Sequence, residues 1–172
     1  IVKVYENNNE VKVFSKMEAL KELLLRNITS HQWNKLYKAE LFDSIIFPEG
    51  KIMEDIAVMP LLIEKSNKIV YQYKPLYYYV KRDSSILGNI NKELIVTLEE
   101  TINKKNCYLK SKYKKDLEKY IDLENFKFIK IYFDDIVICK DKQLLNSNKF
   151  KKYYKLYKIL YKKYKKEIKI SQ

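Results

Sequence analysis

The sequence has few of the residues on which many familiar active sites depend. Its 172 residues include two glycines, one histidine and two arginines. The glycines, Gly50 and Gly88, lie too far apart for the common phosphate-binding loops, which need clustered glycines. The single histidine, His31, disfavours a histidine-based metal cluster and a Ser–His–Asp triad. Because no partner of matching chemistry lies near it in the sequence, we expect His31 to be structural or exposed to solvent.

Cysteines and long hydrophobic runs are also scarce. Cys107 and Cys139 are too few for a disulfide scaffold and lack the spacing of metal ligands, which favours two reduced thiols. The longest uncharged runs have 8 residues, whereas a membrane-spanning helix needs about 20. No basic-then-apolar leader is visible at the amino end. We therefore expect a cytoplasmic protein, and its 47% apolar content favours a globular fold over disorder.

Positive charge is plentiful but unevenly distributed. The net charge is +13, yet residues 1–90 carry 13 basic against 11 acidic residues, whereas residues 91–172 carry 22 against 11. Residues 149–169 alone contain ten lysines and one acidic residue. Only two of the 35 basic residues are arginines, although proteins that read bases favour arginine for its two-pronged contacts. The composition therefore argues against sequence-specific recognition of nucleic acid.

Hydrophobic patterning predicts an α+β, mainly helical fold, with short strands in the first half and only helices after residue 91. The domain organisation predicted from this change is 1–90 and 91–172. A helix over 54–66 either begins late, near Val58, or kinks at Pro60, which lacks the amide that a helix needs. The other predicted elements are strands over 2–5, 11–14, 68–73 and 76–80, a helix over 16–26 that a Ser15–Glu18 capping box introduces, and helices over 92–109, 111–139 and 148–168.

Three strings between residues 31 and 86 carry the most specific signal. Residues 33–42 read WNKLYKAELF, residues 45–58 read IIFPEGKIMEDIAV, and residues 75–86 read PLYYYVKRDSSI. In this order and spacing they resemble the acceptor-side half of bacterial family 2 glycosyltransferases of the GT-A type, which build capsular and related surface glycans. The resemblance implies a partial GT-A fold in the first half, followed by a basic helical extension.

The resemblance also implies site residues on the acceptor side. Asp55 matches the family's catalytic base, which takes a proton from the acceptor hydroxyl, and Glu54 is the neighbour that contacts the acceptor or orients the site. The alternative is that both carboxylates only complement the positive end of a helix dipole. Trp33, with Asn34 and Lys35 beside it, is assigned to substrate binding as a platform for an acceptor sugar. For the tryptophan itself, the sequence favours the other interpretation, a buried anchor.

On the donor side, the resemblance is incomplete. Lys81, Arg82 and Ser85 match a stretch that contacts the donor diphosphate, and the alternative is a solvated charge pair at a strand end. The family's nucleotide-binding half ends in an Asp-x-Asp motif that holds a divalent metal, Mg²⁺ or Mn²⁺, and this sequence has no such half. We therefore expect a carboxy-terminal fragment that binds no metal and is inactive alone, with the metal and the nucleotide-sugar donor held by the missing half of the full-length enzyme.

The lysine-rich tail predicts a further contact. Over residues 148–168, aromatic residues recur every three or four positions and lysines fill the other faces. Such a helix could lie on an anionic membrane surface, which would place the protein on the inner face of the plasma membrane. The alternative is that the aromatic stripe packs on the body of the protein while the lysines face water.

The leading interpretation is a fragment of an inverting glycosyltransferase. The enzyme would transfer a sugar from a nucleotide-sugar donor to a glycan or lipid-linked acceptor in cell-surface polysaccharide synthesis. The alternative from another class is a basic helical module that binds nucleic acid or another polyanion non-specifically. A third hypothesis is an interaction domain whose tyrosine-rich helices pair with a partner chain.

Overall fold

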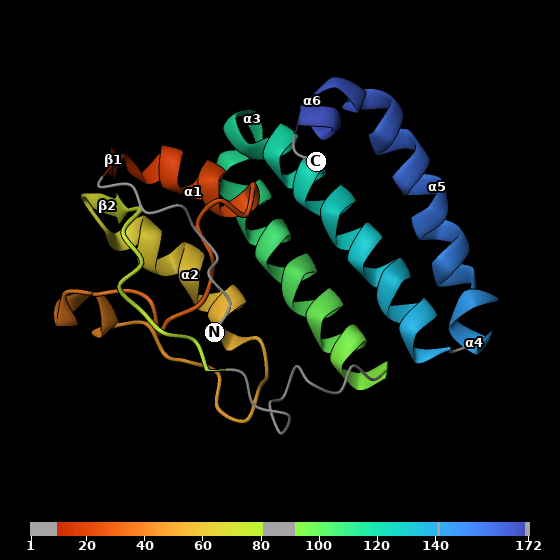
Figure 1. Ribbon diagram of the computed structural model, residues 1–172, viewed down its shortest axis with the longest axis horizontal. Coiled ribbons are helices and arrows are strands. Elements are labelled where there is room, and N and C mark those ends of the chain that lie inside the picture. Colours follow the sequence, from red (N-terminus) through yellow and green to blue (C-terminus); the bar gives the residue numbers. More distant parts are fainter. Residues whose placement is uncertain (1–9, 81–91, 141, 171–172) are drawn as a thin grey trace.

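The computed structural model describes residues 10–80, 92–140 and 142–170. It has the α+β, mainly helical architecture that the sequence predicts, with the strands confined to the first half (Figure 1). The elements in chain order are β1 (Val11–Phe14), α1 (Lys16–Leu24), the 3₁₀ helix η1 (Ala39–Phe42), α2 (Glu54–Lys65), β2 (Ile69–Gln72), α3 (Lys92–Cys139), α4 (Lys142–Leu145), α5 (Asn148–Lys163) and α6 (Lys165–Ile170).

The two strands form one antiparallel sheet, in which Val11 pairs with Gln72 and Phe14 with Ile69. Both strands were predicted, whereas the predicted strand over 2–5 lies outside the described residues. The predicted strand over 76–80 is wrong, because this segment is irregular and its side chains are exposed. Its aromatic and β-branched residues satisfy strand propensity, but propensity does not supply a neighbouring strand with which to pair.

The first helix, α1, begins where its capping box predicts. The Glu18 amide donates to Ser15 Oγ at 3.3 Å, and the Ser15 amide donates to a Glu18 carboxylate oxygen at 2.8 Å. These two bonds satisfy donors that the first helical turn leaves free. Leu20 and Leu24 on the opposite face are fully buried, so the helix is held both by its cap and by packing.

The second helix, α2, begins at Glu54, so the predicted late start near Val58 is wrong. The preceding residue, Met53, has a left-handed backbone with φ of 65°, which turns the chain sharply into the helix. Pro60 lies inside the helix, where it removes one backbone hydrogen bond. The burial of Val58, Leu62 and their neighbours on the same helix compensates for that loss.

The long helix α3 consists of two antiparallel arms. Its backbone is non-helical at Tyr113, with φ of −130° and ψ of 32°. The arms then run side by side, and Asn106 Nδ2 on the first donates to Asn125 Oδ1 on the second at 3.0 Å (Figure 1). Separate helices over 92–109 and 111–139 are therefore confirmed, with the break a few residues later than predicted.

The carboxy-terminal helices pack on the second arm of α3. The ring of Tyr157 on α5 stacks on Phe126 at a centroid distance of 4.6 Å, and Phe150 contacts Phe133 at 4.8 Å. The single helix predicted over 148–168 is in fact two, because Tyr164 between α5 and α6 has a non-helical φ of −121°. The aromatic stripe thus faces the body of the protein, while the lysines of α5 are exposed.

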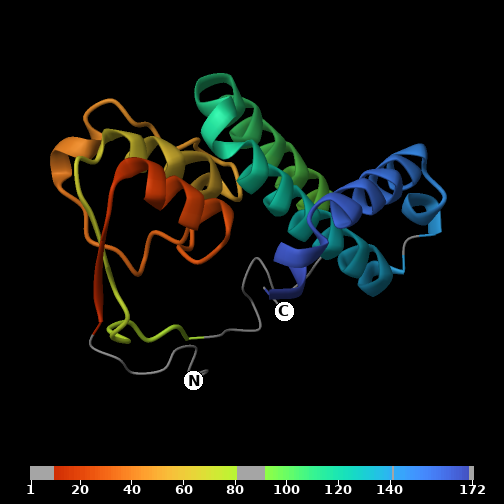
Figure 2. The same cartoon turned by 90° about the horizontal axis from the view of Figure 1, so that it is seen from above.

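The core has two main hydrophobic clusters, and α3 contributes to both. Leu109, Leu117 and Ile121, near the bend, pack with the leucines of α1 and with α2. Ile129 and Tyr132, farther along the second arm, pack with α5 and α6. Figure 2 shows the sheet with α1 and α2 on one side and α5 on the other, with α3 between them. The division into 1–90 and 91–172 stays a prediction.

Candidate active site

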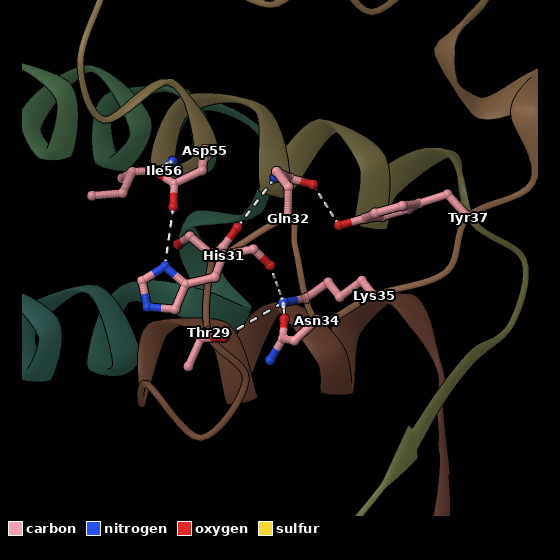
Figure 3. A network of polar contacts seen from close by, with 9 residues as sticks. Thr29, His31, Gln32, Asn34, Lys35, Tyr37, Asp55 and Ile56 are labelled. Carbon is pink, nitrogen blue, oxygen red and sulfur yellow. Dashed lines mark hydrogen bonds and ion pairs between the residues drawn. The ribbon is translucent and has the colours of Figure 1, made fainter. Parts of the chain in front are cut away.

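Asp55 lies in the first turn of α2, with its side chain directed at the loop that follows α1. Its Oδ1 accepts a hydrogen bond from the Ile56 amide at 2.8 Å. Its Oδ2 lies 3.5 Å from His31 Nδ1, a distance that makes the two an ion pair when the imidazole is protonated (Figure 3). The Asp55 side chain is 19% exposed and that of His31 is 45% exposed. The carboxylate is therefore held by two groups at the edge of the surface.

The loop that carries His31 is fixed by its own polar side chains. Lys35 Nζ donates to the His31 carbonyl at 2.6 Å and to Asn34 Oδ1 at 2.8 Å (Figure 3). The Tyr37 hydroxyl donates to Gln32 Oε1 at 2.5 Å. The amine of Lys35 and the amide oxygen of Asn34 thus hold the loop in shape, which in turn positions the His31 ring.

An aromatic cluster, defined here as His31, Trp33, Tyr77 and Tyr79, lies beside the carboxylate. The Trp33 ring is stacked on His31 at a centroid distance of 4.9 Å, and it contacts Tyr77 at 4.6 Å and Tyr79 at 5.0 Å. Trp33 is 40% exposed, so the alternative of a buried anchor is wrong. The irregular segment 76–80 brings Tyr77 and Tyr79 to this cluster, and these rings are also largely exposed.

Burial and the neighbouring polar groups act in opposite directions on the pKa of Asp55. Burial raises the pKa of Asp55, but the contacts with His31 and the Ile56 amide, together with the charge of Lys35, outweigh burial and leave the pKa below its usual value. Burial lowers the pKa of Lys35 to about 8, although the Asp55 charge opposes this shift. Burial and the same carboxylate raise the pKa of Tyr37 to about 12. Asp55 is therefore ionised at neutral pH.

For the other predicted site residues, the structure gives fewer contacts or none. Glu54, at the first position of α2, is half-buried, and its carboxylate makes no hydrogen bond or ion pair with any residue that the structure describes. Lys81, Arg82 and Ser85 lie outside the described residues. Of the predicted set, the structure therefore brings Trp33, Asn34, Lys35 and Asp55 into one neighbourhood, with Glu54 adjacent in the chain.

The described residues do not fit a divalent metal. Within residues 10–80, 92–140 and 142–170, no three histidine, cysteine or carboxylate side chains come together as metal ligands. Asp55 is engaged by an imidazole and a backbone amide instead of by a second carboxylate. Hard divalent cations prefer several oxygen ligands, so no step at this site is assigned to a metal.

Sequence reasoning missed the role of His31 in this site. Its partner Asp55 follows 24 positions later, on a different element, so the pairing depends on how the loop packs against α2. The position of His31 two residues before Trp33 was the one available signal. In the structure these residues lie in an irregular loop with a turn at 33–34, and their rings are stacked.

A surface groove of about 410 Å³ lies elsewhere, between α2 and the bend of α3. Its lining includes Glu64, Tyr108 and Lys112, which contact one another, and none of the candidate site residues. This groove is therefore distinct from the candidate site.

Comparison with known proteins relates part of the chain to a glycosyltransferase. The chain is 36% identical over 84 residues to the glycosyltransferase GlyA of Streptococcus pneumoniae serotype 4 (strain ATCC BAA-334 / TIGR4). It is related to a glycosyltransferase. The match takes in 49% of this chain but only 12% of GlyA. No family model matches the chain, and no solved structure matches it. The relationship supports the glycosyltransferase interpretation in its coarse form and does not favour the polyanion-binding alternative.

No helix within the described ranges has both the length and the apolar character that a membrane crossing requires. The exposed lysines of α5 leave contact with a membrane surface as a prediction.

Proposed function

We propose that this chain forms the acceptor-binding side of an inverting glycosyltransferase. The enzyme transfers a sugar from a nucleotide-sugar donor to a glycan or lipid-linked acceptor during synthesis of a cell-surface polysaccharide. The observation that carries this proposal is the setting of Asp55. It is an ionised carboxylate, fixed at the start of α2, beside exposed aromatic rings. The partial similarity to GlyA supports the same reaction class.

The reaction needs a proton acceptor close to the acceptor hydroxyl. As the hydroxyl oxygen attacks the anomeric carbon of the donor sugar, its proton must leave to a nearby base. Asp55 is the candidate for this task because it is an ionised carboxylate at the edge of the surface, next to the exposed His31. Glu54 precedes it in the first turn of α2 and contacts the acceptor or orients it.

The aromatic cluster suits an acceptor sugar. The C–H faces of a sugar ring are apolar and pack on flat aromatic surfaces, and the exposed rings of Trp33, Tyr77 and Tyr79 offer such surfaces close to the carboxylate. The donor diphosphate, in this proposal, contacts Lys81, Arg82 and Ser85. A divalent metal belongs to the donor-binding part of the full-length enzyme.

The test uses the product of the whole reading frame to which this sequence belongs. We expect Asp55→Asn to lower the acceptor-dependent release of nucleoside diphosphate by a factor of about 10² to 10⁴, the range that general-base catalysis supplies. Asp43→Asn is the matched control, because Asp43 is exposed and lies outside the site. Full transfer activity in Asp55→Asn would overturn the proposal, as would a loss of equal size in the control.

A further inference from the structure

The His31 ring presents two different nitrogens to its surroundings. Nδ1 faces Asp55 Oδ2 at 3.5 Å, whereas the second ring nitrogen, Nε2, points away from the other labelled residues (Figure 3). Within the described part of the chain, Nε2 makes no hydrogen bond. The stacked Trp33 ring fixes the plane of the imidazole, with 15° between the two rings. One nitrogen therefore faces a carboxylate at ion-pair distance, while the other is available to a ligand.

We propose that His31 and Asp55 form a proton-transfer dyad, in which Nε2 of His31 takes the proton of the acceptor hydroxyl and Asp55 holds Nδ1. This inference rests on the proposed glycosyl transfer. It replaces the Asp55 carboxylate by Nε2 of His31 as the atom that takes the proton, and Asp55 then orients the imidazole. A carboxylate that binds one imidazole nitrogen fixes the tautomer in which the other nitrogen carries a free lone pair.

The proton balance of the step is simple. The acceptor O–H bond breaks, and its proton moves to Nε2. The oxygen forms a bond to the anomeric carbon, and the bond from that carbon to the diphosphate oxygen breaks, so the nucleoside diphosphate leaves with the electron pair. His31 ends as an imidazolium, whose positive charge the Asp55 carboxylate stabilises.

Accessibility favours His31 over Asp55 as the group that meets the acceptor. The side chain of His31 is 45% exposed and that of Asp55 is 19% exposed. Each oxygen of Asp55 already faces one partner, the Ile56 amide or the imidazole. The imidazole is stacked directly on Trp33, so an acceptor that contacts the exposed part of the Trp33 ring lies close to it. Lys35 is a further titratable group whose charge acts on Asp55, and the Asp55 charge in turn raises the pKa of the neighbouring Tyr37.

The tautomer of His31 tests the dyad in this chain directly, without an activity assay. Because His31 is the only histidine, a long-range ¹H–¹⁵N correlation spectrum shows one imidazole, and its nitrogen shifts report which atom carries the proton. We expect the neutral ring to carry its proton on Nδ1, and Asp55→Ala to shift the population towards the Nε2–H form. Asp43→Ala, at an exposed position, is expected to leave the spectrum unchanged. A neutral ring protonated mainly on Nε2 in the unmodified chain would overturn the dyad.

Activity of the product of the whole reading frame separates the dyad from the proposed function. Gln at position 31 can still donate to Asp55 but cannot take a proton, so we expect His31→Gln to lower transfer as much as Asp55→Asn does. The double variant should then be no worse than either single variant within a few-fold, because residues that act as one unit are not additive. If only Asp55→Asn loses activity, the dyad is wrong and the proposed function stands. If neither variant loses activity, both proposals are wrong.

Discussion

Residues 10–80 and residues 92–170 use aromatic side chains in opposite ways. In the second region, Tyr132 is 1% exposed and packs with Phe128 and Tyr153 inside a continuous core. In the first region, the rings of Trp33 and Tyr77 lie even closer to each other, at a centroid distance of 4.6 Å, but are 40% and 50% exposed. Buried rings stabilise a fold. Clustered exposed rings leave apolar surface in contact with water, and such surfaces commonly mark a binding site. The candidate site therefore lies in the first region, where the aromatic rings stay exposed.

The two regions also differ in how they accommodate a lysine side chain that is removed from water. In the second region, the buried amine of Lys105 on the first arm of α3 is paired with the equally buried Glu124 on the second arm. In the first region, the half-buried amine of Lys35 is held by neutral oxygens, and its nearest carboxylate influence is Asp55. The pair in α3 stabilises a helix contact, whereas the arrangement around Lys35 shapes a loop next to a site.

The largest effect is expected where the two regions meet. Leu117→Ala removes a fully buried side chain that packs α3 against α1, so we expect a loss of about 3 kcal/mol in the free energy of unfolding. Leu36→Ala is the matched control, because Leu36 is fully exposed, and its effect should stay within about 0.5 kcal/mol. Denaturant unfolding of both variants measures the difference.

The same experiment tests whether the two regions are one cooperative unit. The fluorescence of Trp33, the only tryptophan, reports on the first region, and far-ultraviolet circular dichroism reports mainly on the long helices of the second. Because α3 contributes to both clusters, we expect the two signals to change together. Separate transitions would mean that the two regions unfold independently.

The buried pair should give the next largest effect. Glu124→Gln removes the negative charge beside the Lys105 amine, and we expect a loss of about 2 to 3 kcal/mol in the free energy of unfolding. The exposed pair Lys38–Glu40 is the control, and Glu40→Gln should cost less than about 1 kcal/mol. Equal effects of the two variants in thermal or chemical unfolding would contradict the assignment of Lys105–Glu124 as a buried pair.

The sequence predicts the features that local chemistry decides. The Ser15–Glu18 cap places the start of α1 because both partners lie within one helical turn. The helical arms of α3 follow from their periodicity. The break at Tyr164 has no glycine or proline to mark it, and the strand predicted over 76–80 fails because strand pairing is a tertiary property.

The candidate site shows the same limit. Asp55 and Trp33 could be singled out from their motifs, but the contact between His31 and Asp55 joins residues 24 positions apart on different elements. The stacking of Tyr77 and Tyr79 on Trp33 joins residues that are still farther apart. Motif spacing therefore finds the members of this site, and only the packed loop shows which of them touch.

The exposed lysines of α5 allow a test of whether the second region binds an anionic membrane surface. Lys151, Lys155, Lys158 and Lys162 recur at helical spacing, are exposed and make no ion pair with described residues, and α5 contains no acidic residue. Each lysine near an anionic membrane contributes about 1 kcal/mol to binding. We expect changing all four to glutamine to weaken binding to phosphatidylglycerol-containing vesicles at least tenfold, as measured by co-sedimentation.

A control with the same net charge shows whether the position of the lysines matters. Lys16, Lys38, Lys51 and Lys68 are exposed in the first region, and changing these four to glutamine lowers the net charge equally. If binding depends on the α5 face, this control should retain most of the affinity. Equal weakening in both variants, or no binding by the unmodified chain, would contradict a membrane-facing role for α5.

The smallest effect concerns Lys35, the half-buried lysine beside the candidate site in the first region. Its pKa of about 8 lies below the ordinary value of 10.5 because burial disfavours its charge. Between these two pH values the unfolded chain therefore binds more protons than the folded one, so the contribution of Lys35 to stability rises as the pH increases. We expect the stability of the unmodified chain relative to Lys35→Met to be higher at pH 10 than at pH 7.5. The gain should be below about 1 kcal/mol, since the side chain is only half-buried and solvent screens it.

Lys38→Met, at an exposed position, controls for the loss of one positive charge. A relative stability that falls with pH would mean that the amine gains more from Asp55 than it loses by burial, and would contradict the prediction.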